Sequence, residues 1–511
     1  MAVLNEVMPV LPKAPARRRA RRKLDHWAFN AWWQTREGTG ARCITDAVAE
    51  QLKSQGARIH KRSAYDSAVF AGVVDAVNAN LLRRHLDPGR RSGENVSEDG
   101  GWVSISLSGR RLRAGAPNRY DRTPVPLGTL KSRREKGRAP QTGIIDAMAD
   151  LGLIYLDKAP SYSGATRRSA IKCGIGLMVL IDEHSPQLNE LMLMSRAPAP
   201  GGELIEREMI ELRALPDIGR TRGRDKRRRA ESIEYPDTEQ TEAWRDQIRV
   251  INAGLEAADI TMEPAFVPAE DASANVPPAV QPGAYAIHDR CLRRIFNNAR
   301  WDHGGRLYGG FWQSMRREHR GLVRIAGQPL VNIDFNAVFL QLLYAVKAKK
   351  QIALDEDLYE GIDPVGSWPS DAAIKAARRD AIKQNVNGML FPSDRAKGHR
   401  LVQGTRAAFS KGVTGAVLEQ RIIARHPDIA PWLRQPGIGF ELMHHESEII
   451  VRVLLGCLEQ GVVVLPLHDG LLVAEPNRVI ASEAMVGAFG DYTGGFRPRV
   501  SVAIPRRTAP T

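Results

Sequence analysis

Hydrophobic and polar positions repeat at regular spacing in two stretches of the chain, which a more polar stretch separates. In the first stretch, apolar residues at helical spacing predict helices over 44–55 and 67–84. An alternation of apolar and polar residues over 102–107 predicts a strand. This mixture of patterns predicts an α+β domain over residues 25–212.

A helix and a strand hairpin are predicted near the end of this domain. Apolar spacing predicts a helix at 144–151, followed by a strand at 153–156, a polar tip at 161–169 and a further apolar run. The arrangement resembles a winged helix, in which Arg167 and Arg168 at the tip would contact backbone phosphates. An ordinary α+β module with an exposed, polar hairpin tip is an equally open interpretation.

Residues 213–283 are predicted to be a connector. They begin with a charged run at 219–231 and end with a segment rich in Pro and Ala at 263–283. Between these, the pattern predicts one amphipathic helix at 239–258. Asp237-Thr238-Glu239 has the acidic pattern of a proofreading exonuclease motif, but no apolar strand precedes it, so we interpret it as a helix cap.

The second patterned stretch, residues 284–511, contains the clearest chemical signals. An apolar run leads into Asp334, and helical spacing follows it, which places this aspartate at the end of a strand. Another apolar run at 462–467 leads to His468-Asp469-Gly470 and then resumes, which predicts a β-hairpin with this tripeptide at its turn. Carboxylates on neighbouring strands can chelate two divalent ions about 3.5–4 Å apart. Mg²⁺, with Mn²⁺ as an alternative, needs few protein carboxylates when water and phosphates complete its shell.

Two basic elements accompany the aspartates. Arg379, Lys383 and Asn387 recur at every fourth position and form one stripe on a predicted helix, where cations can bind the β- and γ-phosphates of a nucleotide. Alone, such a stripe is usually a solvated helix face. Arg306 follows two glycines among several aromatic residues and could contact primer or template, although an aromatic core with a tight turn is the alternative.

Charge and composition agree with a nucleic-acid partner. The chain has 511 residues, with 73 Lys or Arg against 58 Asp or Glu and a formal net charge of +15. This excess favours polyanions, nucleic acid before an anionic membrane, while a soluble protein with a basic surface is the alternative. Residues 1–24, with Arg and Lys clustered between 17 and 23, predict a flexible basic arm that adds phosphate contacts.

Other sequence features exclude several classes of protein. The four cysteines are far apart and form no CxxC pair, which argues against a thiolate zinc site and a disulfide framework. We find no run of the roughly eighteen apolar residues that a membrane span requires. The charges near the N-terminus follow its weakly apolar part, so it makes a poor signal peptide. We therefore expect no membrane association and a cytoplasmic location.

The motifs between about residues 290 and 480 resemble those of the family A polymerases, which include bacterial repair DNA polymerases and phage-type single-subunit RNA polymerases. The resemblance implies a right-hand palm and fingers domain over 284–511, preceded by the α+β domain. It assigns Asp334 to motif A, with the backbone carbonyl of Phe335 on a metal, and it assigns Arg379, Lys383 and Phe391 to motif B, His468 and Asp469 to motif C, and Arg306 to the upstream Gly-Arg element. The motif combination is also similar to polymerase-like proteins of bacteria and their mobile elements.

Three positions depart from the family pattern. Phe339 stands where family A DNA polymerases usually have a glutamate that helps to exclude ribose. An aromatic ring can also block a 2′-hydroxyl by its bulk, so the choice of sugar stays open. Pro392 replaces the glycine after the motif B aromatic, and Asn387 replaces an aromatic residue four positions earlier.

These patterns together predict a template-directed nucleotidyltransferase that uses two Mg²⁺ ions, and they favour DNA synthesis. Lys383 is the candidate general acid toward pyrophosphate, and Phe391 and Phe339 are the candidate contacts of the incoming nucleotide. His468 is expected to orient the primer end. The expected partners are a DNA template and primer and nucleoside triphosphates, and protein partners stay open.

Two other functions remain as alternatives. One is an RNA-synthesising primase or single-subunit RNA polymerase, which the missing motif A glutamate allows. The other is a non-catalytic replication initiator or DNA-binding protein with a degenerate palm, against which the retained acids and lysine argue.

Overall fold

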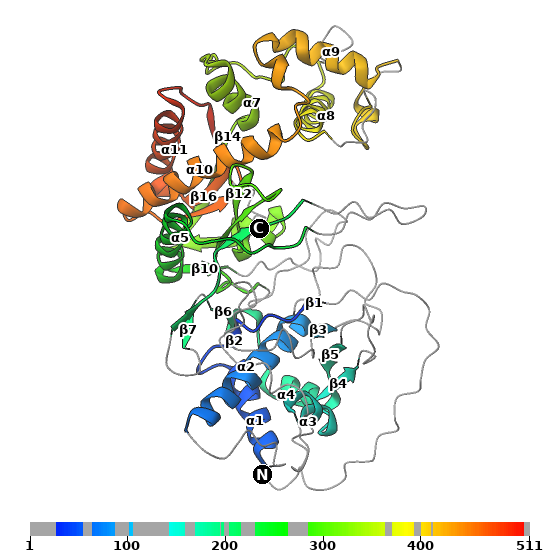
Figure 1. Ribbon diagram of the computed structural model, residues 1–511, viewed down its shortest axis with the longest axis vertical. Coiled ribbons are helices and arrows are strands. Elements are labelled where there is room, and N and C mark those ends of the chain that lie inside the picture. Colours follow the sequence, from blue (N-terminus) through cyan, green and yellow to red (C-terminus); the bar gives the residue numbers. More distant parts are fainter. Residues whose placement is uncertain are drawn as a thin grey trace.

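The structure is a computed structural model of the chain. It describes residues 27–54, 64–86, 102–105, 143–158, 169–194, 196–198, 204–215, 230–263, 285–362, 370–392, 400–409 and 412–504. Helices and strands of these residues bury two separate hydrophobic cores, the first from residues 31–191 and the second from residues 209–489 (Figure 1). The mixed α+β composition that the sequence predicts is confirmed. The predicted arm, residues 1–24, lies outside the described residues.

The first core lies between a four-stranded sheet and four helices. The sheet has the order β1-β3-β5-β4, from β1 (Trp27–Ala28), β3 (Val103–Ile105), β4 (Ile154–Asp157) and β5 (Ser169–Cys173). The helices are α1 (Gly40–Ser54), α2 (Ala64–Leu86), α3 (Ile144–Asp150) and α4 (Ile175–His184). The helices predicted at 44–55, 67–84 and 144–151 and the strands at 102–107 and 153–156 are therefore confirmed, with shifted ends.

The winged-helix interpretation stays a prediction. β4 and β5 pair antiparallel and follow α3, as that interpretation requires. The connection between the two strands, with Arg167 and Arg168, lies outside the described residues.

Short strands lead from the first core to the second. β2 (Trp33–Thr35) pairs with β6 (Leu191–Leu193), and β7 (Arg196–Pro198) pairs with β8 (Leu204–Glu206). β9 (Ile210–Leu212) then joins β11 (Arg293–Phe296) and β12 (Gly304–Tyr308) in a three-stranded sheet. This pairing brings residues before 213 into the second core.

The predicted connector helix also belongs to the second core. α5 (Glu239–Ala257) confirms the helix expected at 239–258, and its apolar face, with Trp244 and Ile248, packs into that core. Thr238 caps α5, because its side chain accepts a hydrogen bond from the backbone N–H of Thr241 at 3.2 Å. The predicted domain boundaries at 212 and 283 stay predictions. Residues on both sides of each boundary contribute to the second core.

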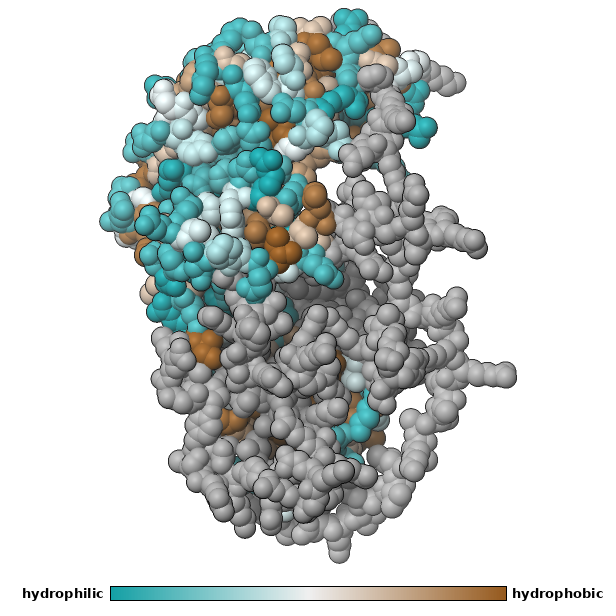
Figure 2. Space-filling view, viewed as in Figure 1, coloured by the Kyte–Doolittle hydropathy of each residue, from teal (hydrophilic) through white to brown (hydrophobic). Residues whose placement is uncertain are grey.

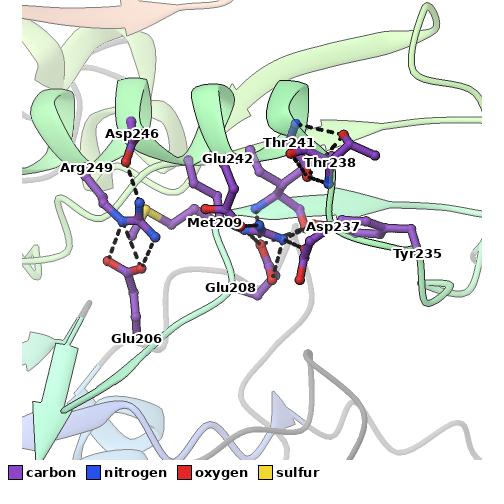
Figure 3. A network of polar contacts seen from close by, with 12 residues as sticks. Glu206, Glu208, Met209, Tyr235, Asp237, Thr238, Thr241, Glu242, Asp246 and Arg249 are labelled. Carbon is purple, nitrogen blue, oxygen red and sulfur yellow. Dashed lines mark hydrogen bonds and ion pairs between the residues drawn. The ribbon is translucent and has the colours of Figure 1, made fainter.

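Ion pairs attach α5 to the strand segment before it (Figure 3). The buried Arg245 donates to Glu208 at 3.1 Å and to Asp237 at 2.7 Å. Arg249 donates to Glu206 at 2.7 Å. Asp237 is thus the partner of a helix arginine, which agrees with its interpretation as part of a cap.

The central sheet of the second core has the order β10-β13-β14-β16-β15, with β17 pairing β14 as well. Its strands are β10 (Ile260–Met262), β13 (Val323–Ile325), β14 (Gln328–Phe335), β15 (Val464–Leu467), β16 (Gly470–Ala474) and β17 (Val500–Ala503). The long strand β14 is buried on both of its faces. Leu330 on one face and Val331 and Ile333 on the other are all less than 4% exposed. Its predicted end at Asp334 is confirmed to within one residue.

Helices cover this sheet and extend from one side of it (Figure 1). They are α6 (Phe311–Ser314), α7 (Val338–Leu342), which continues as a π-helical turn (Leu343–Ala348), α8 (Ala372–Leu390), α9 (Gly415–Arg425), α10 (Ile438–Glu459) and α11 (Arg478–Thr493). The 22-residue α10 packs against α7, α11 and β12. It therefore links most of the elements around the site described next.

On the face seen in Figure 2, hydrophilic side chains predominate over the described residues of the C-terminal part. None of the helices among the described residues combines the length and the apolar character that crossing a membrane demands.

Candidate active site

Strand pairing brings Asp334 and Asp469 together. Asp334 on β14 lies opposite Gly470 of β16, and the N–H of Phe335 donates to the carbonyl of Asp469 at 3.2 Å. β15 and β16 pair from Leu467 to Gly470, which leaves His468 and Asp469 as a two-residue hairpin loop. The predicted hairpin is thus confirmed. His468 has φ 60°, a positive value that two-residue hairpin loops require at their first position.

A cavity of about 900 Å³ opens beside the two aspartates. Its lining combines both acids with cations from other elements: Arg317, Arg320, Asn332, Asp334, Lys383, Leu467, Asp469, Gly470, Leu472, Ala503 and Ile504. A space of this size is typical of small-molecule sites. Two acids, a lysine and two arginines around it give the polar character that a phosphate compound with a divalent cation requires.

The electrostatics of Asp334 depend on burial and on its neighbour. Burial, and then the charge of Asp469, raise the pKa of Asp334 to about 7, while Lys383 opposes the shift. Among the described residues, its buried Oδ1 has no hydrogen-bond partner. Gly470 makes room for this oxygen, because a Cβ there would lie 2.9 Å from it. An additional cation beside this carboxylate would relieve both the repulsion and the missing contact.

The donor set fits a divalent ion whose shell is completed by other ligands. No group of three or more His, Cys, Asp or Glu among the described residues is placed to hold a metal by itself. Two carboxylates with an unpartnered oxygen suit Mg²⁺, which keeps several waters and binds substrate phosphates. They do not suit a closed structural zinc site, which needs four protein ligands.

The two cations of the predicted stripe on α8 have different surroundings. Lys383 lines the cavity and acts on Asp334. Arg379 instead donates to Asp357 at 2.6 and 3.2 Å and lies over the ring of Tyr359. Although burial raises the pKa of Asp357, these hydrogen bonds hold it below its usual value. Arg379 is therefore neutralised in this structure, and its role in phosphate binding stays a prediction.

The predicted aromatic contacts lie next to one another at the ends of α7 and α8. The rings of Phe339 and Phe391 have centroids 5.9 Å apart, and Phe391 also contacts Phe440 of α10 at 5.6 Å. The guanidinium of Arg306 lies 5.4 Å from the centroid of Phe339. One partly exposed group thus combines an arginine with three phenylalanines: Arg306, Phe339, Phe391 and Phe440.

Phe335 and His468 complete the predicted set. The Phe335 ring is buried against Phe489 at 5.7 Å between centroids, and the metal-binding role of its carbonyl stays a prediction. The ring of His468 contacts that of Tyr308 at 5.6 Å. Burial, and then Arg306, lower the pKa of His468, so the neutral ring is the favoured form.

Three charged residues near the aspartates are not among the predicted site residues. Arg317 and Arg320 line the cavity, and Glu446 forms an ion pair with Arg306. The basic run at 316–320, which precedes β13 and β14, was an available signal for the two arginines. Glu446 offered a weaker one, because an acid within His-His-Glu-Ser-Glu does not reveal its partner 140 residues away.

No protein-family model and no curated protein sequence matches the chain. Among solved structures it is similar to the POL domain of Pol1 from M. smegmatis in complex with DNA primer-template and dNTP, with a TM-score of 0.28 and 13% sequence identity. The match covers 42% of this chain and 47% of that chain. So weak a likeness decides no function, and the chain spans less than half the length of this neighbour.

Proposed function

We propose that this chain is a template-directed nucleotidyltransferase, with DNA synthesis as its favoured reaction. The observation that carries the proposal is the convergence of Asp334 and Asp469, which are more than 130 residues apart in the sequence, in one cavity with Lys383. A pair of acids that repel one another beside a cation suits the binding of a metal–triphosphate complex. The net charge of +15 supports a nucleic-acid template.

Each group in the cavity has a distinct part in this proposal. Asp334 and Asp469 would hold divalent ions, which when bound draw the reacting oxygens together and offset their charge. Lys383 would bind the triphosphate and give a proton to the departing pyrophosphate. Arg317, which already acts on Asp334, would add positive potential at the cavity wall.

The aromatic group formed by Phe339 and Phe391 supports selection at the nucleotide sugar. The two rings pack together at the ends of α7 and α8, where bulk rather than a carboxylate would meet a 2′-hydroxyl. The preference for deoxyribonucleotides rests on this bulk. RNA synthesis is the second candidate, because Phe339 leaves no acid at that position to reject ribose.

Primer extension with Mg²⁺ tests the proposal, using deoxyribo- and ribonucleotides in separate reactions. We expect Asp334→Ala and Asp469→Ala each to lower incorporation by at least about 100-fold, because each removes a carboxylate that the reaction needs. Asp491→Ala, at an exposed position of α11, is the matched control and should incorporate nucleotides normally.

A second pair of variants examines the triphosphate. Lys383→Ala should raise KM for the nucleotide and lower kcat, whereas Lys375→Ala, exposed on the same helix, should change neither much. Full incorporation by either aspartate variant would rule out the proposed site. Exclusive use of ribonucleotides by the wild type would replace DNA synthesis with RNA synthesis.

A further inference from the structure

Three consecutive residues of α10 attach this helix to β12 and to the neighbouring strand β11. Glu446 is paired with Arg306, and Ser447 donates to the carbonyl of Gly304 at 3.2 Å. Glu448 accepts from the fully buried Arg294 at 2.8 Å. The same arginine donates from Nε to the carbonyl of Gly305 at 2.9 Å.

The close approach of the two elements explains why glycines precede Arg306. Gly304 and Gly305 have φ of 84° and 80°, a region that L side chains rarely adopt. A Cβ on Gly305 would lie 2.8 Å from the hydroxyl of Ser447. The backbone before Arg306 is therefore fixed against α10, and this limits where its guanidinium can reach.

Glu446 is an unusual acid for this position. Its side chain is fully buried, and two nitrogens of Arg306 donate to the same oxygen, Oε2. Among the described residues, the other oxygen has no hydrogen-bond partner. Burial raises the pKa of Glu446, Arg306 opposes the shift, and Asp469 and Asp334 add to it. Three acids therefore share one neighbourhood, and one of them is matched by the arginine.

Arg306 lies on the strand that packs against the hairpin loop of Asp469. Tyr308 of that strand contacts the ring of His468, with centroids 5.6 Å apart, and His468 directly precedes Asp469. The charge of Arg306 also lowers the pKa of His468. Without Glu446, the guanidinium would be an unmatched cation near this loop, and a cation there competes with any metal ion for the carboxylates.

We infer that Glu446 is a positioning residue that binds Arg306 and so keeps the Asp334–Asp469 pair free for divalent cations. The metal-binding pair then owes part of its affinity to an acid that does not itself bind the metal. The purpose of the ions rests on the proposed function, while the charge balance can be measured by itself. It also gives a role to the acidic segment at 444–448, which the predicted site did not include.

Binding of Mn²⁺ alone, followed by electron paramagnetic resonance, tests this inference without any turnover. Glu446→Gln keeps the shape of the side chain and removes its charge, and we expect it to weaken Mn²⁺ binding about tenfold. Adding Arg306→Gln to this variant should restore the affinity to within about twofold of the wild type. A purely structural role for Glu446 would not give this rescue, because the double variant loses the ion pair altogether.

Glu446→Asp is the second variant, for the case in which Glu446→Gln does not fold. Its shorter side chain should weaken the grip on Arg306 and the binding of Mn²⁺, and Arg306→Gln should again reverse the loss. Wild-type affinity in Glu446→Gln, or a loss that Arg306→Gln does not reverse, would overturn the inference.

Primer extension separates this inference from the proposed function. Synthesis by the wild type, together with unchanged Mn²⁺ binding in Glu446→Gln, would refute the role of Glu446 alone. The opposite result is that the Mn²⁺ affinities of the wild type and the variants follow the expected order but the wild type incorporates no nucleotide. This result would refute the transferase and leave the role of Glu446 supported.

Discussion

At the scale of single residues, the site depends on the close approach of the Asp334 and Asp469 carboxylates. Asp334 faces a glycine across the sheet, and its Oδ1 lies only 2.9 Å from the place where a Cβ at position 470 would be. This leaves the carboxylate close to Asp469 and turned toward the cavity. The first residue of β16 therefore has to be a glycine, because the acid on the neighbouring strand occupies the space beside it.

Gly470→Ala should reduce activity and stability together. Its Cβ would lie 2.8 Å from the carbonyl of Ile333 and 2.9 Å from Oδ1 of Asp334, so the strands have to shift. We expect a loss of about 1–3 kcal/mol in the free energy of unfolding, measured by urea denaturation, and a lower rate of primer extension. Gly487→Ala, in α11 with open space around it, is the control and should be neutral or stabilising. A fully active Gly470→Ala would contradict the tight approach.

How far the site could be predicted differs among its residues. Asp334 and Asp469 could be placed from the sequence, because the apolar runs before them indicate a strand end and a hairpin turn. A residue at a strand end or a turn has a well-defined place at the edge of its sheet. The pairing of Arg379 with Asp357 could not be predicted, since the sequence of α8 gives its helical face but not the acid that the connecting segment presents to it. For the same reason, Glu446 was visible only as one of several acids.

At the scale of elements, α5 shows what periodicity leaves open. Its amphipathic pattern predicts a helix, but nothing in the pattern tells which core its apolar face joins. The structure packs Trp244 against Phe296 of β11, with ring centroids 4.6 Å apart. Arg245, on the adjoining face, holds Glu208. A helix that composition assigns to a connector is thus part of the second core.

Arg245→Met should destabilise the second core. The substitution keeps an apolar stem but removes the charged hydrogen bonds that Arg245 donates to the nearly buried Glu208, whose side chain is 10% exposed. We expect a loss of about 3 kcal/mol in the free energy of unfolding, measured by chemical denaturation. Lys350→Leu, which breaks an exposed pair with Asp428, should cost less than about 1 kcal/mol. Equal effects of the two substitutions would show that burial of the Arg245 pair does not matter.

At the scale of the whole molecule, one polar contact links the segment after β2 with the segment before β11. Arg36 lies 2.8 Å from Nε2 of His288, which as a neutral ring accepts the hydrogen bond. Burial, and then the charges of Arg36 and Arg290, lower the pKa of His288 to about 4. Such a contact between sequence positions 252 residues apart is outside the reach of local pattern analysis.

The stability of the chain should therefore fall as the pH drops from 6.5 to about 4. In this window the unfolded His288 binds a proton that the folded ring excludes, so acid favours unfolding. His288→Gln removes this contribution, and its urea midpoint should depend less on pH than that of the wild type. Identical slopes for both proteins between pH 4.5 and 6.5 would refute the assignment.

The position of β17 in the sheet has a consequence for how the chain is made. This strand pairs with β14 along the residues around Asp334, and Ala503 forms part of the cavity wall. A nascent polypeptide on the ribosome would expose both aspartates before this strand, which begins 31 residues after Asp469, emerges from the exit tunnel. The cavity can then be completed only after residue 503 has left the tunnel. Until that point, a ligand that reached the aspartates would meet a sheet that lacks β17.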